Sequence, residues 1–435
     1  MNKIAILILI AFNWIPLSAK IPLQQAITRG IQKSLVIQNN LLEQKNLKLE
    51  KKTRDMKKWL TLHLGGSYIF KSQQMEINFL EIQINEGISV PLEPIIVGAR
   101  HNYDLKLGLS QPIYTGNRLS NSAKLKDIQY EMEKHNTGLN TIEVSTRIKT
   151  SYFTYRMLFY QQQSVNAFLE TLQLHQRKLE DFYLENLIKK SDLLETEFHL
   201  QEQMMNLEEI KLRIAREKIN FKSLCDFNIE DISGDYTETI EPGPELLSDF
   251  QNHHPYLQML NAQIRLLEIQ KRLTNAEYLP QLVGFAEIHY GRPGIDYFTN
   301  EWSLYFQGGI GFDLKLFDWN QRKRNQKILN YSQEKSRNKQ KDFSREVENQ
   351  VRQLLESKKA IEIKLAIIGN LIEISREDTE LKAELFQEQQ ITNKDYLASL
   401  ATKERYVFME KEQQLQIEMI KVNINKWLGL FDRKF

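Results

Sequence analysis

The sequence predicts an α+β membrane protein in which each chain contributes four β-strands to a barrel shared between subunits. Its long α-helices are expected to form a coiled coil or a helical tube. Three observations lead to this class: a repeated order of elements, four segments that alternate apolar and polar residues, and two very long helical stretches. The content of glycine and proline, 18 and 10 residues among 435, favours such helices over several compact domains.

Composition excludes several other classes. The chain has 58 basic and 56 acidic side chains, and a net charge of +2 argues against a dedicated nucleic-acid binder. No series of apolar runs of about 20 residues is present, which excludes a polytopic helical membrane protein. The single cysteine, Cys225, excludes an intramolecular disulfide and any site with several thiolate ligands.

The first residues have the layout of a secretory signal peptide. Lys3 precedes a mostly apolar run over 4–15, and the small residue Ala19 offers a cleavage point. The run is too short to span a bilayer, although an N-terminal anchor is the alternative. Residues 1–19 are therefore predicted to direct the chain out of the cytoplasm and to be removed.

The rest of the chain is predicted to be a tandem duplication. Gln111–Arg118 matches Leu314–Gln321 in character, and Ser191–Leu194 matches Lys394–Leu397. Both matches have the same offset of 203 residues, as from 111 to 314 and from 191 to 394. A shared offset at two distant places indicates internal repetition. The predicted division is a first repeat over 20–225, a linker rich in glycine and proline over 226–254, and a second repeat over 255–435.

Each repeat is predicted to contain a helix, two strands, a very long helix and a further helix. At about 1.5 Å per residue, the very long helices would each extend roughly 100 Å, which no ordinary globular core accommodates. A coiled coil or a helical tube is the structure that such helices indicate. The predicted helices cover, in pairs, 23–56 and 255–277, then 118–185 and 321–388, then 192–224 and 396–430.

Alternation of apolar and polar residues marks the four predicted strands. Such a strand has one apolar face, which meets a second sheet in a soluble sandwich and lipid in a membrane barrel. The length of the segments favours the barrel, because membrane strands need about 9–11 residues and globular strands average about five or six. The segments are about 60–71, 103–110, 281–290 and 302–316, and the third alternates least regularly.

Aromatic residues near the strand ends fit the girdles of a membrane barrel. Trp59, Tyr103, Tyr290, Trp302 and Trp319 are examples. Four strands cannot close around a lumen, because about eight is the practical minimum. The barrel must therefore be shared between subunits, and a trimer would supply twelve strands.

Several short segments resemble those of the TolC-like outer-membrane factor family, also described as outer membrane efflux proteins. Ile21–Ile27 is similar to the mature N-terminus of that family. His254–Leu257, followed by Tyr278–Leu282, resembles its helix and strand in the second repeat. Gln111–Arg118 and Leu316–Gln321 resemble its junctions between strand and helix. Each motif is weak alone, and their order, spacing and duplication over the whole mature chain make the resemblance specific.

The resemblance implies a homotrimer with a twelve-stranded barrel in the outer membrane and a helical tunnel, an α-barrel, through the periplasm. It implies passive export as the exit duct of a tripartite efflux or type I secretion system. The expected partners are outer-membrane lipid, a periplasmic adaptor (a membrane fusion protein) and an inner-membrane pump of the RND or ABC type. No enzymatic activity, cofactor or nucleic acid is expected. Small-molecule efflux and protein secretion are both left open.

The predicted periplasmic gate lies at the interruptions between the long helices. Asp192 and Asp395 would each repeat three times around the tunnel mouth, where carboxylate rings select for cations. Helix capping by these aspartates is the simpler alternative, and both roles can coexist. Phe386 matches an aromatic gate position of the family, although a plain core position is the alternative. Three lysines complete the predicted gate: Lys189, Lys190 and Lys394.

The gate region departs from the family pattern in two ways. A glycine often precedes the tip aspartate by six residues, and Asn186 and Gln389 occupy those positions. Asparagine tolerates the left-handed conformation, whereas Gln389 leaves the second turn open. An arginine that often pairs with the tip acids is replaced by Ile391. Lysines nearby are the candidate substitutes.

The main alternative is a secreted coiled-coil adaptor or scaffold without a membrane barrel. The duplicated pair of long strands argues against it, because adaptors normally carry one helical hairpin. His253 and His254 could suggest a metal site, but adjacent side chains point apart and no third ligand is near. No arrangement of catalytic residues stands out.

Overall fold

The computed structural model describes residues 20–78, 82–85, 88–90, 93–233, 236 and 250–430. The predicted signal peptide lies outside this part of the chain. The chain divides into two compact units, each built from several segments. The first, here the helical unit, combines 1–42, 134–258 and 340–435; the second, here the strand unit, combines 43–133 and 259–339.

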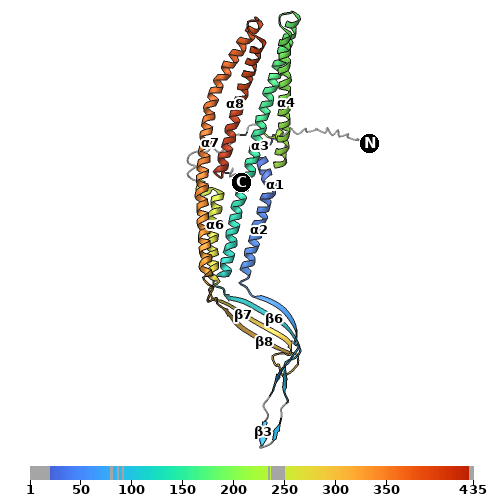
Figure 1. The fold of residues 1–435 in the computed structure, drawn as a ribbon, viewed down its shortest axis with the longest axis vertical. Helices are drawn as coiled ribbons and strands as arrows, with labels where there is room; N and C mark the ends of the chain where they lie inside the picture. The colour runs from blue at the N-terminus through green and yellow to red at the C-terminus, as the bar shows by residue number, and fades with distance from the viewer. Residues whose placement is uncertain are drawn as a thin grey trace, which may run out of the picture. The chain divides into compact units, whose positions relative to one another are not determined.

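Long helices dominate the described part of the chain (Figure 1). The predicted helices are confirmed within a few residues at each end. None of the described helices is both long enough and apolar enough to cross a membrane. The helices are α1 (Leu23–Lys33), α2 (Leu35–Met56), α3 (Arg118–Leu184), α4 (Lys190–Cys225), α6 (Pro255–Ala276), α7 (Gln321–Gln387) and α8 (Asn393–Trp427), with the 3-10 turn η1 (Ile229–Asp231).

The predicted helix over 23–56 is divided in two at Ser34. Ser34 has an extended ψ of 111°, so its N–H ends α1 by donating to the Gly30 carbonyl at 3.0 Å. Its own carbonyl accepts from Gln38 N at 3.0 Å and starts α2. The side chain of Gln38 donates to the Gln32 carbonyl at 2.8 Å. These bonds satisfy backbone groups that a helix break would otherwise leave unpaired.

Helices α3 and α7 each contain 67 residues. Both bounds of α7 follow those of α3 by 203 residues, from 118 to 321 and from 184 to 387. The helices that follow end on left-handed residues at the same offset, Asp226 after α4 and Gly429 after α8. The duplication stays a prediction, which these matching bounds support.

A four-stranded antiparallel sheet forms the centre of the strand unit. Its order is β1-β6-β7-β8, so β1 and β8 are its edges. The four predicted strands are confirmed, and the fourth ends at Asp313 rather than at Leu316. The strands are β1 (Thr61–Phe70), β6 (His101–Tyr114), β7 (Gln281–Arg292) and β8 (Ser303–Asp313).

The described residues between β1 and β6 contain four further short strands, which were not predicted from the sequence. They pair as β2 (Met75–Ile77) with β5 (Ile95–Val97), and β3 (Ile82–Asn85) with β4 (Ile88–Val90). Strands of three or four residues are too short to display the two-residue period that marks the longer ones. Among the described residues, such short strands occur only between β1 and β6.

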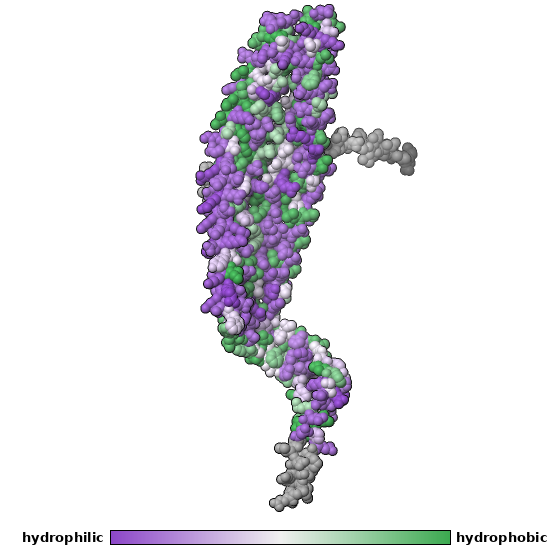
Figure 2. All heavy atoms as spheres, viewed as in Figure 1, coloured by the Kyte–Doolittle hydropathy of each residue, from purple (hydrophilic) through white to green (hydrophobic). Residues whose placement is uncertain are grey.

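The sheet has one apolar and one polar face, as the alternation predicts. One row across all four strands joins Leu64, Leu107, Ile288 and Phe306, which are 71%, 44%, 46% and 67% exposed. The adjacent row on the opposite face includes Lys106, His289 and Tyr305. On the face drawn in Figure 2, polar residues cover most of the helices, and hydrophobic residues are prominent among the strands. Such apolar exposure requires a covering partner.

The main core of the helical unit lies where α1 packs on α3 and α4. Ile21 bridges to Ile232, and its N–H donates to the Asp231 carbonyl at 2.8 Å. Gly30 allows close helix approach, because a Cβ there would lie 3.1 Å from the Leu224 carbonyl and against Ile148. The buried residues around this contact include Leu23, Ala26, Ile27, Phe153, Phe221 and Cys225.

Candidate functional site

Two equivalent turns, the α3–α4 turn and the α7–α8 turn, carry the predicted gate residues in the helical unit. Asn186 and Gln389 both have φ of 58°, in the left-handed region. Leu187 N donates to the Phe182 carbonyl at 2.9 Å, and Asn186 N donates to Tyr183. In the α7–α8 turn, Gln390 N donates to the Leu385 carbonyl and Gln389 N donates to the Phe386 carbonyl. Both helices thus end in the Schellman motif, and Gln389 adopts the conformation that glycine usually supplies.

The two predicted acids occupy equivalent positions at the starts of α4 and α8. Asp192 Oδ2 accepts from Lys189 N at 3.1 Å. Asp395 Oδ2 accepts from Thr392 N at 3.2 Å and from Thr392 Oγ1 at 2.6 Å, while Asp395 N donates back to Thr392 Oγ1. Each carboxylate therefore caps its helix from the third position, and Thr392 is the true N-cap.

Asp395 is exposed and keeps its negative charge. The hydrogen bonds from the Thr392 side chain and backbone lower the pKa of the Asp395 carboxyl, and the charges of Lys382 and Lys394 add to this effect. Lys189, Lys190 and Lys394 are exposed beside the turns. The predicted charges therefore lie at the two turns, where Asp395 and the three lysines are exposed and Asp192 is half-buried.

Phe386 lies in a buried aromatic cluster rather than on the surface. Its ring stacks on Tyr396 with centroids 5.7 Å apart and meets the edge of His175 at 5.3 Å. Phe386 and Tyr396 also line a cavity of about 280 Å³ together with His175, Lys178, Phe182, Ala383 and Gln387. The cluster connects the last turn of α7 with the first turn of α8 and with α3.

Asn393 joins the two turns. It is 2% exposed, and its Nδ2 atom donates to the Asp192 carbonyl and Thr196 Oγ1, both at 3.1 Å, and to Glu195 Oε2 at 3.2 Å. Its Oδ1 atom lies 2.7 Å from His175 Nε2. Because Nδ2 is the donor on the other side, Oδ1 accepts and His175 carries its proton on Nε2. One buried amide thus fixes the start of α8 against α3 and α4.

His175 and Asn393 are functional candidates that the sequence analysis missed. Burial lowers the pKa of the His175 imidazole, with the Asn393 hydrogen bond acting in the opposite direction, so the ring is neutral at physiological pH. A sequence signal for the burial of His175 was available, because it shares one face of α3 with Leu172 and Leu179, which are both fully buried. Asn393 carried no signal, because an asparagine at a helix start usually caps.

Comparison with known proteins identifies the fold. No family model and no curated protein matches the sequence. Solved structures do match over nearly the whole chain. The outer membrane protein VceC from Vibrio cholerae is 13% identical with a TM-score of 0.73, over 94% of this chain and 96% of that one. The Campylobacter jejuni CmeC outer membrane channel is 11% identical with a TM-score of 0.74, over 97% and 89%.

The Neisseria gonorrhoeae MtrE outer membrane channel, in its open state, is 13% identical with a TM-score of 0.72, over 95% of this chain and 90% of that one. The class that the structure defines is therefore the fold of the TolC-like outer-membrane channels. This chain has that fold, and its helices and four long strands follow one another along the chain in the order that the sequence predicts.

Proposed function

We propose that this protein is the outer-membrane channel of an export system and that it conducts substrates passively across the periplasm and the outer membrane. The observation that carries the proposal is the likeness of nearly the entire chain to solved outer-membrane channels. A channel of this kind performs no catalysis, and the proposed location is the outer membrane with the helices in the periplasm. The proposed partners are a periplasmic adaptor and an inner-membrane pump.

The sheet supports a homotrimer with a shared barrel. Its edge strands β1 and β8 each offer a row of backbone groups along 10 and 11 residues. Pairing of β8 with β1 of the next copy would satisfy those groups, and three copies give a closed barrel of twelve strands. The exposed apolar face would then meet lipid, while the polar face would line the lumen.

Two exposed apolar stripes on the helical unit support the same assembly. Phe198, Met205, Leu212 and Ile219 recur at heptad spacing on α4 and are 53–71% exposed. A second heptad stripe on α7 contains Ile367, Ile374 and Leu381, which are 54–62% exposed. Coiled-coil partners cover such stripes.

The two stripes also match in their distance from the turns. Phe198 follows the start of α4 at Lys190 by about two helical turns, and Leu381 precedes the end of α7 at Gln387 by a little less. α4 runs away from its turn and α7 runs toward its own turn. Successive heptad positions on the two helices therefore lie at similar distances from the turns. We propose that α4 of one copy packs on α7 of the next.

Purification from outer membranes tests the assembly. The detergent-extracted protein is expected to have the mass of three chains, measured by light scattering. Phe198→Cys combined with Leu381→Cys is expected to give disulfide-linked dimers and trimers on mild oxidation, whereas Phe198→Cys combined with Ile328→Cys, on a distant part of α7, is the matched control. A detergent-free monomer in the periplasm would support an adaptor or scaffold and overturn the proposal.

The gate residues are proposed to act at the periplasmic mouth of this trimer. Asp395 would form an acidic ring, and Asp192 would line or brace it, with Lys189, Lys190 and Lys394 moderating the field. Capping holds both carboxylates in fixed positions at the turns, which a ring of defined geometry requires. Phe386 would act through its packing, because its side chain is 9% exposed.

A further inference from the structure

The segment that joins β8 to α7 differs from its equivalent 203 residues earlier in the chain. We call residues 314–327 the β8–α7 junction and residues 111–124 the β6–α3 junction. The β8–α7 junction contains five basic side chains and one acidic one, whereas the β6–α3 junction contains two basic side chains and no acidic one. Both junctions belong to the strand unit. The proposed gate makes no use of the difference, because it lies in the helical unit.

Trp319 occupies a position at which the β6–α3 junction has a glycine. Gly116 and Asn117 have φ of 56° and 65°, and the equivalent residues Trp319 and Asn320 have φ of 54° and 60°. Both backbones therefore pass through the left-handed region, which glycine tolerates and a bulky side chain rarely adopts. A tryptophan in this conformation costs folding free energy, and such strain favours a role other than folding.

Trp319 belongs to a group of exposed apolar side chains. Near the end of β8, Ile310 and Phe312 lie on the apolar face of the sheet. Leu316, Phe317 and Trp319 follow in the β8–α7 junction and are 86%, 68% and 78% exposed. The rings of Phe317 and Trp319 meet edge to face with centroids 4.9 Å apart. The exposed apolar surface of the sheet thus continues into the junction.

Basic side chains flank these apolar residues on both sides in the sequence. Lys315, Lys323 and Arg324, here the junction cations, are all exposed. Lys315 Nζ lies 5.1 Å from the centroid of the Tyr278 ring, and Arg324 Nη1 donates to the Trp319 carbonyl at 2.8 Å. Cations at the start of a helix oppose its dipole, and the first turn of α7 contains no acid that would compensate them.

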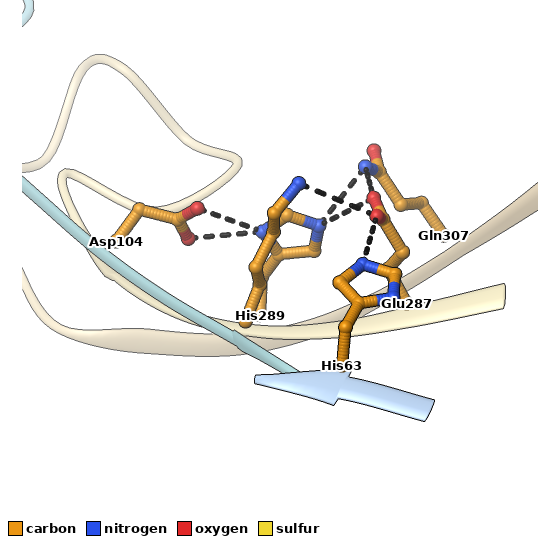
Figure 3. A network of polar contacts seen from close by, with 6 residues as sticks. His63, Asp104, Glu287, His289 and Gln307 are labelled. Carbon is orange, nitrogen blue, oxygen red and sulfur yellow. Dashed lines mark hydrogen bonds and ion pairs between the residues drawn. The ribbon is translucent and has the colours of Figure 1, made fainter. Parts of the chain in front are cut away.

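Charged side chains on the polar face of the sheet are paired, unlike the junction cations. Figure 3 shows a network in which polar side chains contact one another: His63, Asp104, Glu287, His289 and Gln307. Carboxylate oxygens of Asp104 and Glu287 lie 2.9 and 3.3 Å from the two ring nitrogens of His289. Among the described residues, none of the junction cations forms an ion pair. Their charge is therefore available to an anionic ligand.

We propose that the β8–α7 junction binds anionic phospholipid at the periplasmic surface of the outer membrane. Leu316, Phe317 and Trp319 would lie among the acyl chains, while the junction cations would contact the phosphate groups. The inference rests on the proposed function, because it needs the sheet in the membrane and the helices in the periplasm. Tryptophan favours the interface between a membrane and water, and clustered lysine and arginine attract anionic lipid there.

Charge favours lipid over a second copy as the occupant of this surface. In the proposed trimer, β8 pairs with β1 of the next copy, which brings the residues just before β1 near the junction. Lys57 and Lys58 are among those residues, and Asp55 is already paired with Lys58 at 2.8 Å. Direct packing of the two copies would place like charges together, which disfavours contact. An anionic headgroup complements both sides.

Binding of labelled lipid to the purified trimer in detergent tests the proposal. The probes are fluorescently labelled phosphatidylglycerol, which is anionic, and phosphatidylcholine, which has no net charge, and anisotropy measures their binding. The wild type is expected to prefer phosphatidylglycerol. Combining Lys315→Gln, Lys323→Gln and Arg324→Gln is expected to weaken phosphatidylglycerol binding by about fivefold for each cation removed.

A matched control removes the same charges elsewhere on α7. Lys335→Gln, Arg337→Gln and Lys339→Gln, combined, replace two exposed lysines and one exposed arginine further along the helix. This variant is expected to bind phosphatidylglycerol as the wild type does. If the triple variant of the junction does not assemble, Lys323→Gln alone is expected to show a loss of about fivefold.

Trp319→Gly separates lipid binding from folding. Glycine relieves the left-handed strain, so thermal unfolding of the variant trimer in lipid-free detergent is expected at the wild-type temperature or above it. The same variant is expected to bind phosphatidylglycerol more weakly, because it lacks the indole ring. Loss of both stability and lipid binding would mean that Trp319 serves the fold of the junction, and would overturn its role as a lipid contact.

Equal binding of the two lipids by the wild type, or equal binding of phosphatidylglycerol by the junction variant and its control, would overturn the proposal. A Trp59→Cys, Trp319→Cys double variant that forms disulfides between copies and binds lipid like the wild type would assign the surface to a second copy instead. Failure to recover any trimeric wild-type protein from outer membranes would overturn the proposed channel function. The failures are thus distinguishable.

Discussion

His175 Nε2 and Asn393 Oδ1 lie 2.7 Å apart in a buried hydrogen bond that joins α3 to the first residue of α8. The same asparagine donates to the carbonyl of Asp192, so it links both turns that carry the predicted gate. Asp395 is exposed and Asp192 is half-buried, and the residue that contacts both turns is buried.

Asn393→Leu is expected to destabilise the helical unit by about 1–3 kcal/mol, because it keeps the volume but leaves the buried His175 N–H without its acceptor and removes the hydrogen bond to the Asp192 carbonyl. Thermal or urea unfolding of the purified protein measures the change. Lys394→Leu, at the exposed neighbouring position, is the matched control and is expected to be nearly neutral. Equal unfolding midpoints for the two variants would mean that the Asn393 bonds do not hold the turns together.

Stability is expected to fall as the pH drops from about 6.5 to about 4, because burial lowers the pKa of His254 from 6.5 to about 4. In this window the unfolded chain binds a proton that the native protein excludes, which costs up to about 3 kcal/mol. His254 Nδ1 accepts from Tyr256 N at 3.1 Å at the start of α6, so protonation there would also remove a helix cap.

A pH series of unfolding midpoints checks this effect. His254→Asn retains a capping oxygen but has no titrating group. The variant is expected to be less stable at neutral pH, and its unfolding midpoint is expected to fall less steeply as the pH is lowered. Burial lowers the pKa of His175 in the same direction, so some slope is expected to remain. If the unfolding midpoint of the variant fell with pH as steeply as that of the wild type, His254 would not be the source of the acid sensitivity.

Leu107→Arg or Ile310→Arg is expected to impair membrane insertion, at a cost of about 2–4 kcal/mol near the bilayer midplane. Both side chains lie on the exposed apolar face, at 44% and 69% exposure. Ser67→Arg places the same charge on the opposite face, opposite Asp104 across the β1–β6 pair, and is expected to be mild. The yield of folded trimer from outer membranes is the measurement.

A polar-face control has to avoid the glycines. Gly309→Ser is unsuitable, because a Cβ at that position would lie only 3.0 Å from the ring of Phe285. If Ser67→Arg and Leu107→Arg reduced the yield equally, the assignment of lipid-facing and lumen-facing sides would be wrong.

Asp395→Asn is expected to reduce the cation preference of the otherwise unaltered channel and to weaken block by divalent cations. Three carboxylates within a Debye length, roughly 8–10 Å at physiological salt, attract cations. Asparagine can still accept the Thr392 hydrogen bonds, so the helix start is expected to persist. Lys394→Gln, which removes a neighbouring positive charge, is expected to act in the opposite direction.

The same bilayer recordings decide the role of Asp192. If Asp395→Asn and Asp192→Asn both leave selectivity and block unchanged, the two residues act only as helix caps. A constriction elsewhere in the pore would then control ion passage.

The amino-acid sequence by itself determined the elements of this fold and their order. Period-two alternation marks β1, β6 and β8, and polar stretches poor in glycine and proline mark α3 and α7 to within a few residues. These are local properties, set by the backbone geometry of each element. The break at Ser34 and the short strands β2 to β5 were not predicted, because neither changes the hydrophobic periodicity over enough residues.

Only the tertiary structure decided which side chains meet. His175 and Asn393 are far apart in the sequence, as are Asp104 and His289, and their contacts exist because helices and strands from both halves pack together. The charged residues of the predicted gate could be named from the sequence, since acids that begin a helix after an interruption follow a local pattern. A buried polar contact has no local sequence pattern, because its two partners meet only when distant parts of the chain pack together.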